Sequence, residues 1–234
     1  MSSNQSSPAV PDDTEARILD TAGRVFAEAG FHNAKVRDIC ARAGVNLAAI
    51  NYHFGDKLGL YREVLQRAAG AGVDPSLFDP SLPGPSPQAR LFGFVRGLLE
   101  HMYGEDRPAW PVRLMTHELA QPSPALDGVV EQMFRPRYEA ARALVSSIIR
   151  LPRDDRRTRL CTQSIIGQVT VYAHGREALK RLWPDLKFTP ETLDEIAAHI
   201  AAFSYAALRS MARHAAAKQT ERKQPGGRRR RTQS

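Results

Sequence analysis

Residues 36–57 read VRDICARAGVNLAAINYHFGDK, and this stretch decides the fold of the N-terminal part of the chain. Val36 and Ile39 share one face of a short predicted helix, which ends at Gly44, where a left-handed conformation costs glycine little. Asn46 is a good N-cap for a second helix. Two short helices joined by so tight a turn predict a helix-turn-helix, a motif that places its second helix in the major groove of DNA.

The outer face of the second helix carries the side chains that we expect to contact DNA. Asn51 can form a bidentate pair with adenine, which is worth roughly 1–3 kcal/mol of discrimination against other bases. Tyr52, His53 and Lys57 suit phosphate oxygens or thymine methyl groups. Small residues before them allow the backbone to approach the groove. The predicted DNA-contacting residues are Arg37, Asn46, Leu47, Ala48, Ala49, Asn51, Tyr52, His53 and Lys57.

Helices are expected on both sides of this motif. Residues 13–30 repeat apolar side chains at three-to-four spacing and end at a glycine. Residues 56–69 continue from the motif with a second amphipathic pattern. The sequence therefore predicts a helix-turn-helix DNA-binding domain over 13–66, preceded by a disordered segment at 1–12.

This N-terminal pattern resembles the DNA-binding domain of the TetR family of transcriptional regulators over about residues 12–66. The residues that carry the resemblance are Phe26, Gly30, Phe31, Val36, Ile39, Ala43, Gly44, Val45, Tyr52, His53, Phe54 and Lys57. The family usually has Tyr where this chain has Asn51, so the phosphate contact of that position does not carry over. Within the family, the chain resembles the CecR-like subgroup at residues 43–55, 124–127, 135–138 and 181–185.

The basic charge of the chain is concentrated at its C-terminal end. The formal net charge is +8 for 234 residues, and residues 213–234 hold eight Lys or Arg against one Glu. That surplus of +7 leaves only +1 for residues 1–212. Residues 218–234 are expected to form a disordered basic tail. The tail is either an auxiliary nonspecific DNA-binding arm or a solvated terminus without a selected role.

The chain shows no pattern that indicates an enzyme. Its seven His form no H-E-x-x-H motif and no Cys/His spacing for a metal, and neither G-x-S-x-G nor a Gly-rich phosphate loop occurs. We therefore expect no catalytic residue, no metal and no cofactor. An all-α enzyme or a metal sensor is the weaker alternative.

The same composition suggests a cytoplasmic protein. Cys40 and Cys161 lie on apolar helix faces in different regions, which favours packed thiols over a disulfide. The first residues lack the basic and apolar regions of a signal peptide. No run of apolar residues is long enough for a transmembrane helix.

Residues 67–217 are expected to form a helical ligand-binding and dimerisation domain. Three helix starts combine a Ser or Thr N-cap with Pro at the next position, at Ser86-Pro87, Ser123-Pro124 and Thr189-Pro190. The predicted helices cover 87–103, 109–120, 124–150, 154–181 and 190–217. A kink is expected at Pro136, and residues 71–86 form a Pro/Gly-rich linker or loop.

Two predicted helices of this domain carry apolar repeats suited to a dimer interface. The candidate interface residues are Ile165, Val171, Ile196, Ile200, Phe203 and Ala207. Periodicity alone also allows these residues to face the core of their own chain. The TetR resemblance implies dimerisation through the last two helices, and proteins that read a palindrome need such a two-fold axis.

A set of bulky and adaptable side chains forms a candidate ligand pocket. Its members are Phe94, Met102, Trp110, Met115, His117, Phe134 and Tyr138. Taken one by one, such residues are as easily explained as core. The TetR resemblance favours the pocket because that family binds small effectors in this region, although the effector is not identified by the sequence.

Together these features predict an all-α regulator of transcription with an N-terminal helix-turn-helix domain and a C-terminal helical bundle. We expect a homodimeric, ligand-responsive repressor whose partners are a palindromic double-stranded operator and a small molecule, with no membrane partner. The alternative is a nonspecific architectural DNA-binding protein that uses its Arg-rich tail.

Overall fold

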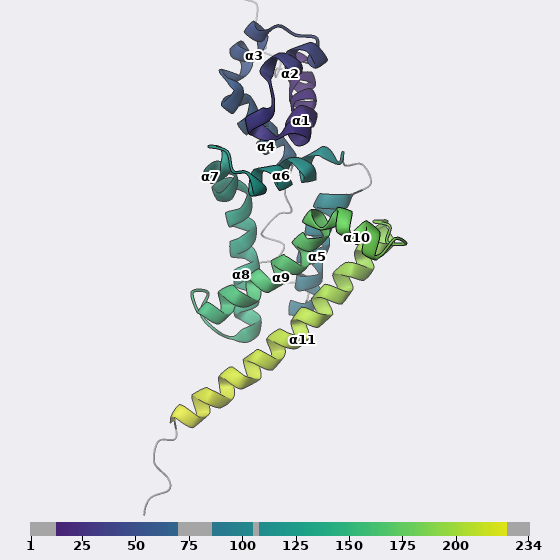
Figure 1. The fold of residues 1–234 in the computed structure, drawn as a ribbon. Coiled ribbons are helices and arrows are strands. Elements are labelled where there is room, and N and C mark those ends of the chain that lie inside the picture. The colour runs from purple at the N-terminus through teal and green to yellow at the C-terminus, as the bar shows by residue number, and fades with distance from the viewer. Residues whose placement is uncertain (1–12, 70–85, 105–107, 224–234) are drawn as a thin grey trace, which may run out of the picture. The chain divides into compact units, whose positions relative to one another are not determined.

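The computed structural model describes residues 13–69, 86–104 and 108–223, and their regular structure is entirely helical (Figure 1). This confirms the predicted fold class. The predicted disordered segment at 1–12, the linker at 71–85 and the end of the basic tail beyond 223 lie outside the described residues. No helix in the described ranges combines the length and apolar character needed to cross a membrane.

The chain divides into two compact units. The first, here called the head unit, comprises Met1–Gly72 and Asp106–Arg135, and the second, the body unit, comprises Val73–Glu105 and Pro136–Ser234. Packing therefore groups residues 106–135 with the N-terminal helices, whereas the sequence predicts a single domain boundary between these helices and the C-terminal domain, after residue 66. Periodicity shows that a helix has an apolar face but not which other helix covers it. The assignment of 13–66 as the DNA-binding domain stays a prediction.

The head unit is built on the predicted helices around the helix-turn-helix. Its helices are α1 (Asp13–Asn33), α2 (Val36–Ala43), α3 (Leu47–Phe54), α4 (Lys57–Ala69), α6 (Trp110–Ala120), α7 (Leu126–Val129) and the π-helical turn η2 (Val130–Phe134). The regular backbone of α1 breaks at Gly30, whose φ of 72° explains the predicted stop there. The largest fully buried side chains of this core include Ile18, Phe26, Ile39, Ile50, Tyr61 and Leu65.

The body unit has its own hydrophobic core. Its helices are α5 (Pro87–Tyr103), α8 (Arg135–Ile149), α9 (Arg156–His174), α10 (Arg176–Leu182) and α11 (Pro190–Lys223). The predicted caps at the starts of α5 and α11 are present. Ser86 accepts a hydrogen bond from the Ala89 amide, and Thr189 accepts one from the Thr192 amide. The core contains Leu91, Val95, Leu99, Leu144, Ile149 and Leu193.

The helix predicted over 124–150 is interrupted before its proline. Ser123 accepts a hydrogen bond from the Ala125 amide, but the helical residues begin only at Leu126. A π-helical turn, in which the Arg135 amide donates to the Val130 carbonyl, lies directly before Pro136, where the sequence predicts a kink. Proline supplies no amide for the preceding turn, and a wider turn is one way in which a helix accommodates that loss.

Two other predicted boundaries were wrong. The single helix expected over 154–181 is divided at Gly175 into α9 and α10. The last helix runs on to Lys223, so residues 218–223 are helical rather than part of a disordered tail. The sequence AAAKQTERK at 215–223 is rich in strong helix formers, which explains the extension.

Candidate DNA-binding site

The turn between α2 and α3 has the geometry that the sequence predicts. Gly44 adopts a left-handed conformation, with φ 65° and ψ 37°, and its amide donates to the Cys40 carbonyl. The Val45 amide donates to the same carbonyl at 3.1 Å. The Asn46 side chain accepts a hydrogen bond from the Ala49 amide at 2.9 Å, so its predicted role as N-cap of α3 is confirmed.

The inner faces of α2 and α3 are fixed in the head core. Ile39 and Ile50 are both fully buried, one from each helix. The Arg17 Nε of α1 donates to the Ala43 carbonyl at 3.1 Å, which satisfies a free carbonyl at the end of α2. The orientation of α3 is therefore determined by buried side chains, and its opposite face is left to solvent.

The outer face of α3 is exposed as the sequence predicts. Tyr52 is 86% exposed and Leu47 is 55% exposed, while Ala48 and Asn51 are exposed beside them. The Asn51 side chain forms no hydrogen bond with the described part of the chain. Its amide is therefore available for a base edge, and its DNA contact stays a prediction.

Other predicted DNA-contacting residues already have partners within the head unit. His53 is half-buried, with its Nδ1 3.9 Å from a Glu15 carboxylate oxygen. Lys57 donates to the His32 carbonyl at 3.4 Å and lies 4.8 Å from the centre of the Phe31 ring. Burial also lowers the pKa of Lys57. Each contact uses only one of the polar groups of its side chain, because Lys carries three donors and His has a second ring nitrogen, so phosphate contacts of His53 and Lys57 stay predictions.

Arg37 lies on α2, outside the recognition helix. Its side chain is exposed and sits 3.7 Å from the Asp38 carboxylate. An exposed ion pair of this kind contributes little to stability, so the guanidinium can exchange Asp38 for a phosphate at small cost. Arg37 stays a predicted phosphate contact.

The junction between α3 and α4 is unusually close. Gly55 has φ 79°, and its amide donates to the Asn51 carbonyl. The Asp56 side chain then caps α4 by accepting from the Gly59 amide at 2.7 Å. A Cβ atom at Gly59 would lie 2.0 Å from the Phe54 carbonyl oxygen. Because only glycine permits this approach, the position of α3 depends directly on that of α4.

A buried polar network holds α4 to the second half of the head unit. The Tyr61 hydroxyl of α4 donates to Glu118 of α6 at 2.8 Å. Glu118 is only 1% exposed, and it also accepts from the amide and the hydroxyl of Ser123, at 3.1 and 3.0 Å. Burial and the neighbouring Glu118 raise the pKa of Tyr61 strongly. Sequence reasoning missed this network, although a carboxylate within the predicted helix 109–120 was a signal for it.

The seven predicted pocket residues are divided between the two units. Four lie in the head unit and three in the body unit, namely Trp110, Met115, His117 and Phe134, and Phe94, Met102 and Tyr138. In the head unit, the Trp110 ring packs so closely on Gly23 of α1 that a Cβ there would lie 2.7 Å from it. In the body unit, Phe94 is part of the core, and Met102 packs against it. A pocket formed by this whole set stays a prediction.

The six predicted interface residues fall into two groups. Ile165, Ile196 and Ile200 are buried in the core of the body unit, which is the alternative that periodicity left open. Val171, Phe203 and Ala207 are exposed, the first two by 51% and 65%. Ile196, Ile200, Phe203 and Ala207 lie on one stripe of the same helix, so periodicity alone did not separate its buried members from its exposed ones.

The exposed group belongs to a larger apolar face on α9 and α11. The two helices run antiparallel, because Cys161 lies beside Met211 and Gln168 donates to Ser204 at 3.1 Å. We call this surface the α9/α11 face, and its apolar members are Leu160, Val171, Phe203, Ala207 and Met211.

A fixed helix-turn-helix with an exposed recognition helix, in an all-helical chain, defines the class of helix-turn-helix DNA-binding regulators. Comparison with protein families identifies the family within that class. Residues 18–64 match the model of the bacterial regulatory proteins of the tetR family, and residues 87–208 match that of the C-terminal domain of the HTH-type transcriptional dual regulator CecR. The chain belongs to the TetR family of transcriptional regulators, with a C-terminal domain of the CecR type. It is a DNA-binding regulator of transcription rather than an enzyme.

Individual relatives agree with this assignment. The chain is 25% identical over 178 residues to the dual regulator CecR of Shigella flexneri, a match that covers 72% of this chain and 79% of that protein. It is 41% identical over 56 residues to the transcriptional activator FasR of Mycolicibacterium smegmatis, which covers 24% of this chain and 26% of FasR.

Solved structures share the fold. A TetR-like regulator from Rhodococcus sp. RHA1 superposes with a TM-score of 0.61 at 18% identity, covering 85% of this chain and 99% of that one. FadR from Bacillus subtilis, solved in complex with stearoyl-CoA, gives a TM-score of 0.60 at 15% identity, covering 81% of this chain and 97% of FadR.

Proposed function

We propose that this regulator is a ligand-responsive repressor that binds a palindromic operator as a homodimer. The observation that carries the proposal is the outer face of α3. Leu47, Asn51 and Tyr52 are exposed there, on a helix whose other side is buried at Ile50. A rigidly held helix with a free polar and apolar edge suits the reading of bases in the major groove.

The α9/α11 face supports the dimer. Phe203 and Val171 are large apolar side chains that a monomer would leave in water. A second copy placed over the same face by a two-fold axis would bury them, and such an isologous contact is the commonest kind in homo-oligomers. Two related recognition helices would then enter successive major grooves, roughly 34–36 Å apart.

The ligand response is supported by the connection from α4 to α3. Because Gly59 lies directly against the Phe54 carbonyl, a shift of α4 displaces the end of the recognition helix. A ligand that binds better to one position of α4 than to another would change operator affinity by that difference. A neighbour of the same fold, FadR from Bacillus subtilis, was solved with stearoyl-CoA bound.

We propose that the protein represses transcription rather than activating it. Among the relatives are a dual regulator, an activator and the repressor BepR of Brucella suis. Similarity therefore does not distinguish repression from activation, and an experiment must do so. A dimer that covers two successive grooves of a promoter excludes other proteins from the same DNA. We expect transcription from the cognate promoter to rise when the gene for this protein is deleted, and a fall would contradict repression.

The direct test is the selection of bound fragments from genomic DNA by the purified full-length protein. We expect an inverted repeat whose half-sites are separated by about one helical turn, since each half-site faces one recognition helix. Recovery of a single unrepeated half-site would contradict the dimeric palindrome.

A truncation separates this function from that of an architectural protein. Removal of residues 224–234 deletes the four consecutive Arg at 228–231. A regulator should keep its preference for the selected site over scrambled DNA, because base contacts come from α3. An architectural protein should lose most of its binding, and the dependence of that binding on salt should weaken with it.

A further inference from the structure

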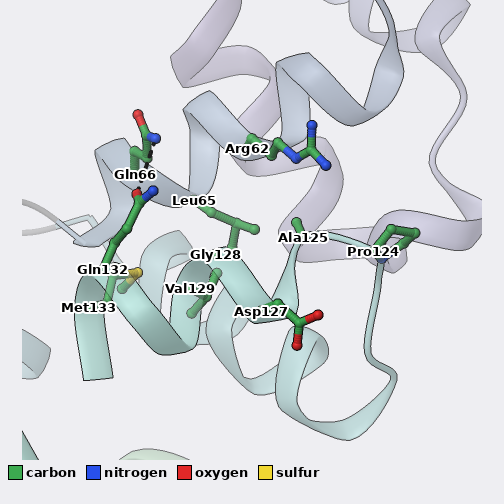
Figure 2. Close-up of a pocket in the computed structure, with 10 residues that line it drawn as sticks. All are labelled: Arg62, Leu65, Gln66, Pro124, Ala125, Asp127, Gly128, Val129, Gln132 and Met133. Atoms are coloured by element: carbon green, nitrogen blue, oxygen red, sulfur yellow. Dashed lines mark hydrogen bonds between the residues drawn. The ribbon is translucent and has the colours of Figure 1, made fainter. Parts of the chain in front are cut away.

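A pocket of about 460 Å³ lies within the head unit, between α4 and residues 124–133 (Figure 2). Ligand pockets in proteins commonly measure roughly 300–1,000 Å³. None of the seven residues predicted to bind an effector lines this pocket. It is formed by one face of α4 and by the short helix α7 with its π-helical turn, an irregularity that is frequent at functional sites.

The floor of the pocket is apolar and its edges are polar. Leu65, Ala125, Val129 and Met133 line it and are each at least nine-tenths buried. Gln66 donates to Gln132 at 3.4 Å and forms one side of the pocket in Figure 2. Arg62 and Asp127 stand at the other side.

The two charges at that edge have no partner in the described part of the chain. Neither the Arg62 guanidinium nor the Asp127 carboxylate forms an ion pair or a hydrogen bond with another described side chain, and they do not pair with each other. Guanidinium groups bind carboxylates with two parallel hydrogen bonds, and carboxylates bind ammonium groups. An anion and a cation on one ligand would satisfy both.

We propose that this pocket binds a small zwitterion with an apolar body, of the class of apolar amino acids and short peptides. The ligand carboxylate lies against Arg62, its ammonium group against Asp127, and its apolar side chains over Leu65 and Val129. The volume exceeds the needs of one small side chain, which favours a dipeptide over a single amino acid. As far as it concerns control of DNA binding, the inference rests on the proposed function.

The pocket adjoins the network that fixes α4. Ala125, on its floor, donates its amide to the Ser123 hydroxyl, and Ser123 donates to Glu118, the partner of Tyr61. Leu65 lies one turn after Tyr61 on α4. A ligand between α4 and α7 therefore presses on both sides of this network and biases the position of α4.

Gly128 offers a way to fill the pocket without disturbing the backbone. It lines the pocket, and a Cβ added there would meet no atom within 4 Å. Gly128→Met should therefore occupy the cavity, and Gly128→Ala is the matched control that leaves it largely open. Thermal unfolding of both variants shows whether each keeps its fold.

The test is calorimetric titration of the full-length protein with the dipeptide leucyl-leucine and two derivatives that each lack one charge. We expect leucyl-leucine to bind at millimolar concentrations or below. N-acetyl-leucyl-leucine and leucyl-leucine amide should bind about tenfold more weakly, since each loses one charge-assisted contact. Gly128→Met should abolish binding, and Gly128→Ala should retain it.

Charge-removing variants on the pocket edge keep the test independent of the cavity-filling one. Arg62→Gln should weaken the binding of leucyl-leucine but leave the binding of leucyl-leucine amide unchanged. Asp127→Asn should weaken the binding of leucyl-leucine but leave that of N-acetyl-leucyl-leucine unchanged. No binding of leucyl-leucine, binding that ignores both charges, or binding that survives Gly128→Met would each overturn the proposal.

Operator affinity, measured in the same samples, separates this inference from the proposed function. Sequence-specific DNA binding without any dipeptide binding overturns the pocket assignment alone. Dipeptide binding through Arg62 and Asp127 that leaves operator affinity unchanged supports the site, and contradicts its role in a ligand-responsive repressor.

Discussion

At the scale of single residues, we expect DNA recognition to depend on a few individual side chains. Residues 213–234 hold most of the positive surplus of the chain, so bulk charge does not explain specific binding by the head unit. His53 and Lys57 are engaged with Glu15 and His32, whereas the Asn51 side chain has no hydrogen-bonding partner among the described residues. Asn51 is therefore the first position to test.

Asn51→Ala should weaken binding to the selected operator by about 1–3 kcal/mol, because a bidentate contact with one base is lost. Binding to scrambled DNA should not change, since that contact depends on sequence. Fluorescence anisotropy with both duplexes measures the difference. Gln88→Ala, an exposed change on α5, is the control and should have no effect. Equal losses on both duplexes would show that Asn51 does not read a base.

Glu118 is the second residue whose role can be isolated. Glu118→Leu should lower the free energy of unfolding by at least about 2 kcal/mol, since Tyr61 and Ser123 would keep buried donors without an acceptor. Adding Tyr61→Phe removes one of those donors. The double variant should therefore lose less stability than the sum of the losses of the two single variants. Urea denaturation measures all three variants. Strictly additive losses would mean that the two groups do not act as a network.

At the scale of secondary structure elements, the junction of α3 and α4 positions the recognition helix. The turn is made by Gly55 at positive φ and by the Asp56 cap, and Gly59 admits the Phe54 carbonyl. This contact joins α3, the proposed recognition helix, to α4, which carries part of the proposed ligand site, so its rigidity matters for both proposals.

Gly59→Ala should destabilise the head unit by roughly 2 kcal/mol or more, because the new methyl group would overlap the Phe54 carbonyl oxygen at 2.0 Å and the backbone must move. Gly128→Ala on α7, in the same unit, is the matched control, since a Cβ there meets no atom within 4 Å. That change should be neutral or stabilising by about 0.4–1 kcal/mol. Thermal unfolding compares the two, and similar midpoints would contradict the close contact.

At the scale of the whole molecule, the proposed dimer depends on which apolar residues the body unit leaves exposed. The core of that unit contains the buried Ile165, Ile196 and Ile200, while Val171 and Phe203 are exposed on the α9/α11 face. A charge placed on that face should separate the protomers without entering the core.

Phe203→Glu should convert the dimer to a monomer that is still folded, because a carboxylate at a self-complementary face meets its own symmetry mate. Sedimentation velocity measures the change, and binding to the palindrome should weaken with it. Leu182→Glu is the control, since this residue is 81% exposed on α10 and is not among the residues that define the α9/α11 face. A dimer that persists in Phe203→Glu and dissociates in Leu182→Glu would move the interface to α10.

The sequence by itself determined the local structure. Gly44 and Asn46 define the turn and the N-cap of α3 through contacts within a few residues, and such contacts are encoded by neighbours in the chain. The same holds for the caps at Ser86 and Thr189, and for the family, whose motifs are local.

Only the tertiary structure decided which apolar faces meet. Glu118 and Tyr61 are 57 positions apart, and no spacing rule joins them. The division of Ile200 and Phe203 between core and surface, and the pocket between α4 and α7, likewise depend on helices that are distant in sequence. Periodicity gives each helix an apolar side, but only packing between distant segments assigns that side a partner.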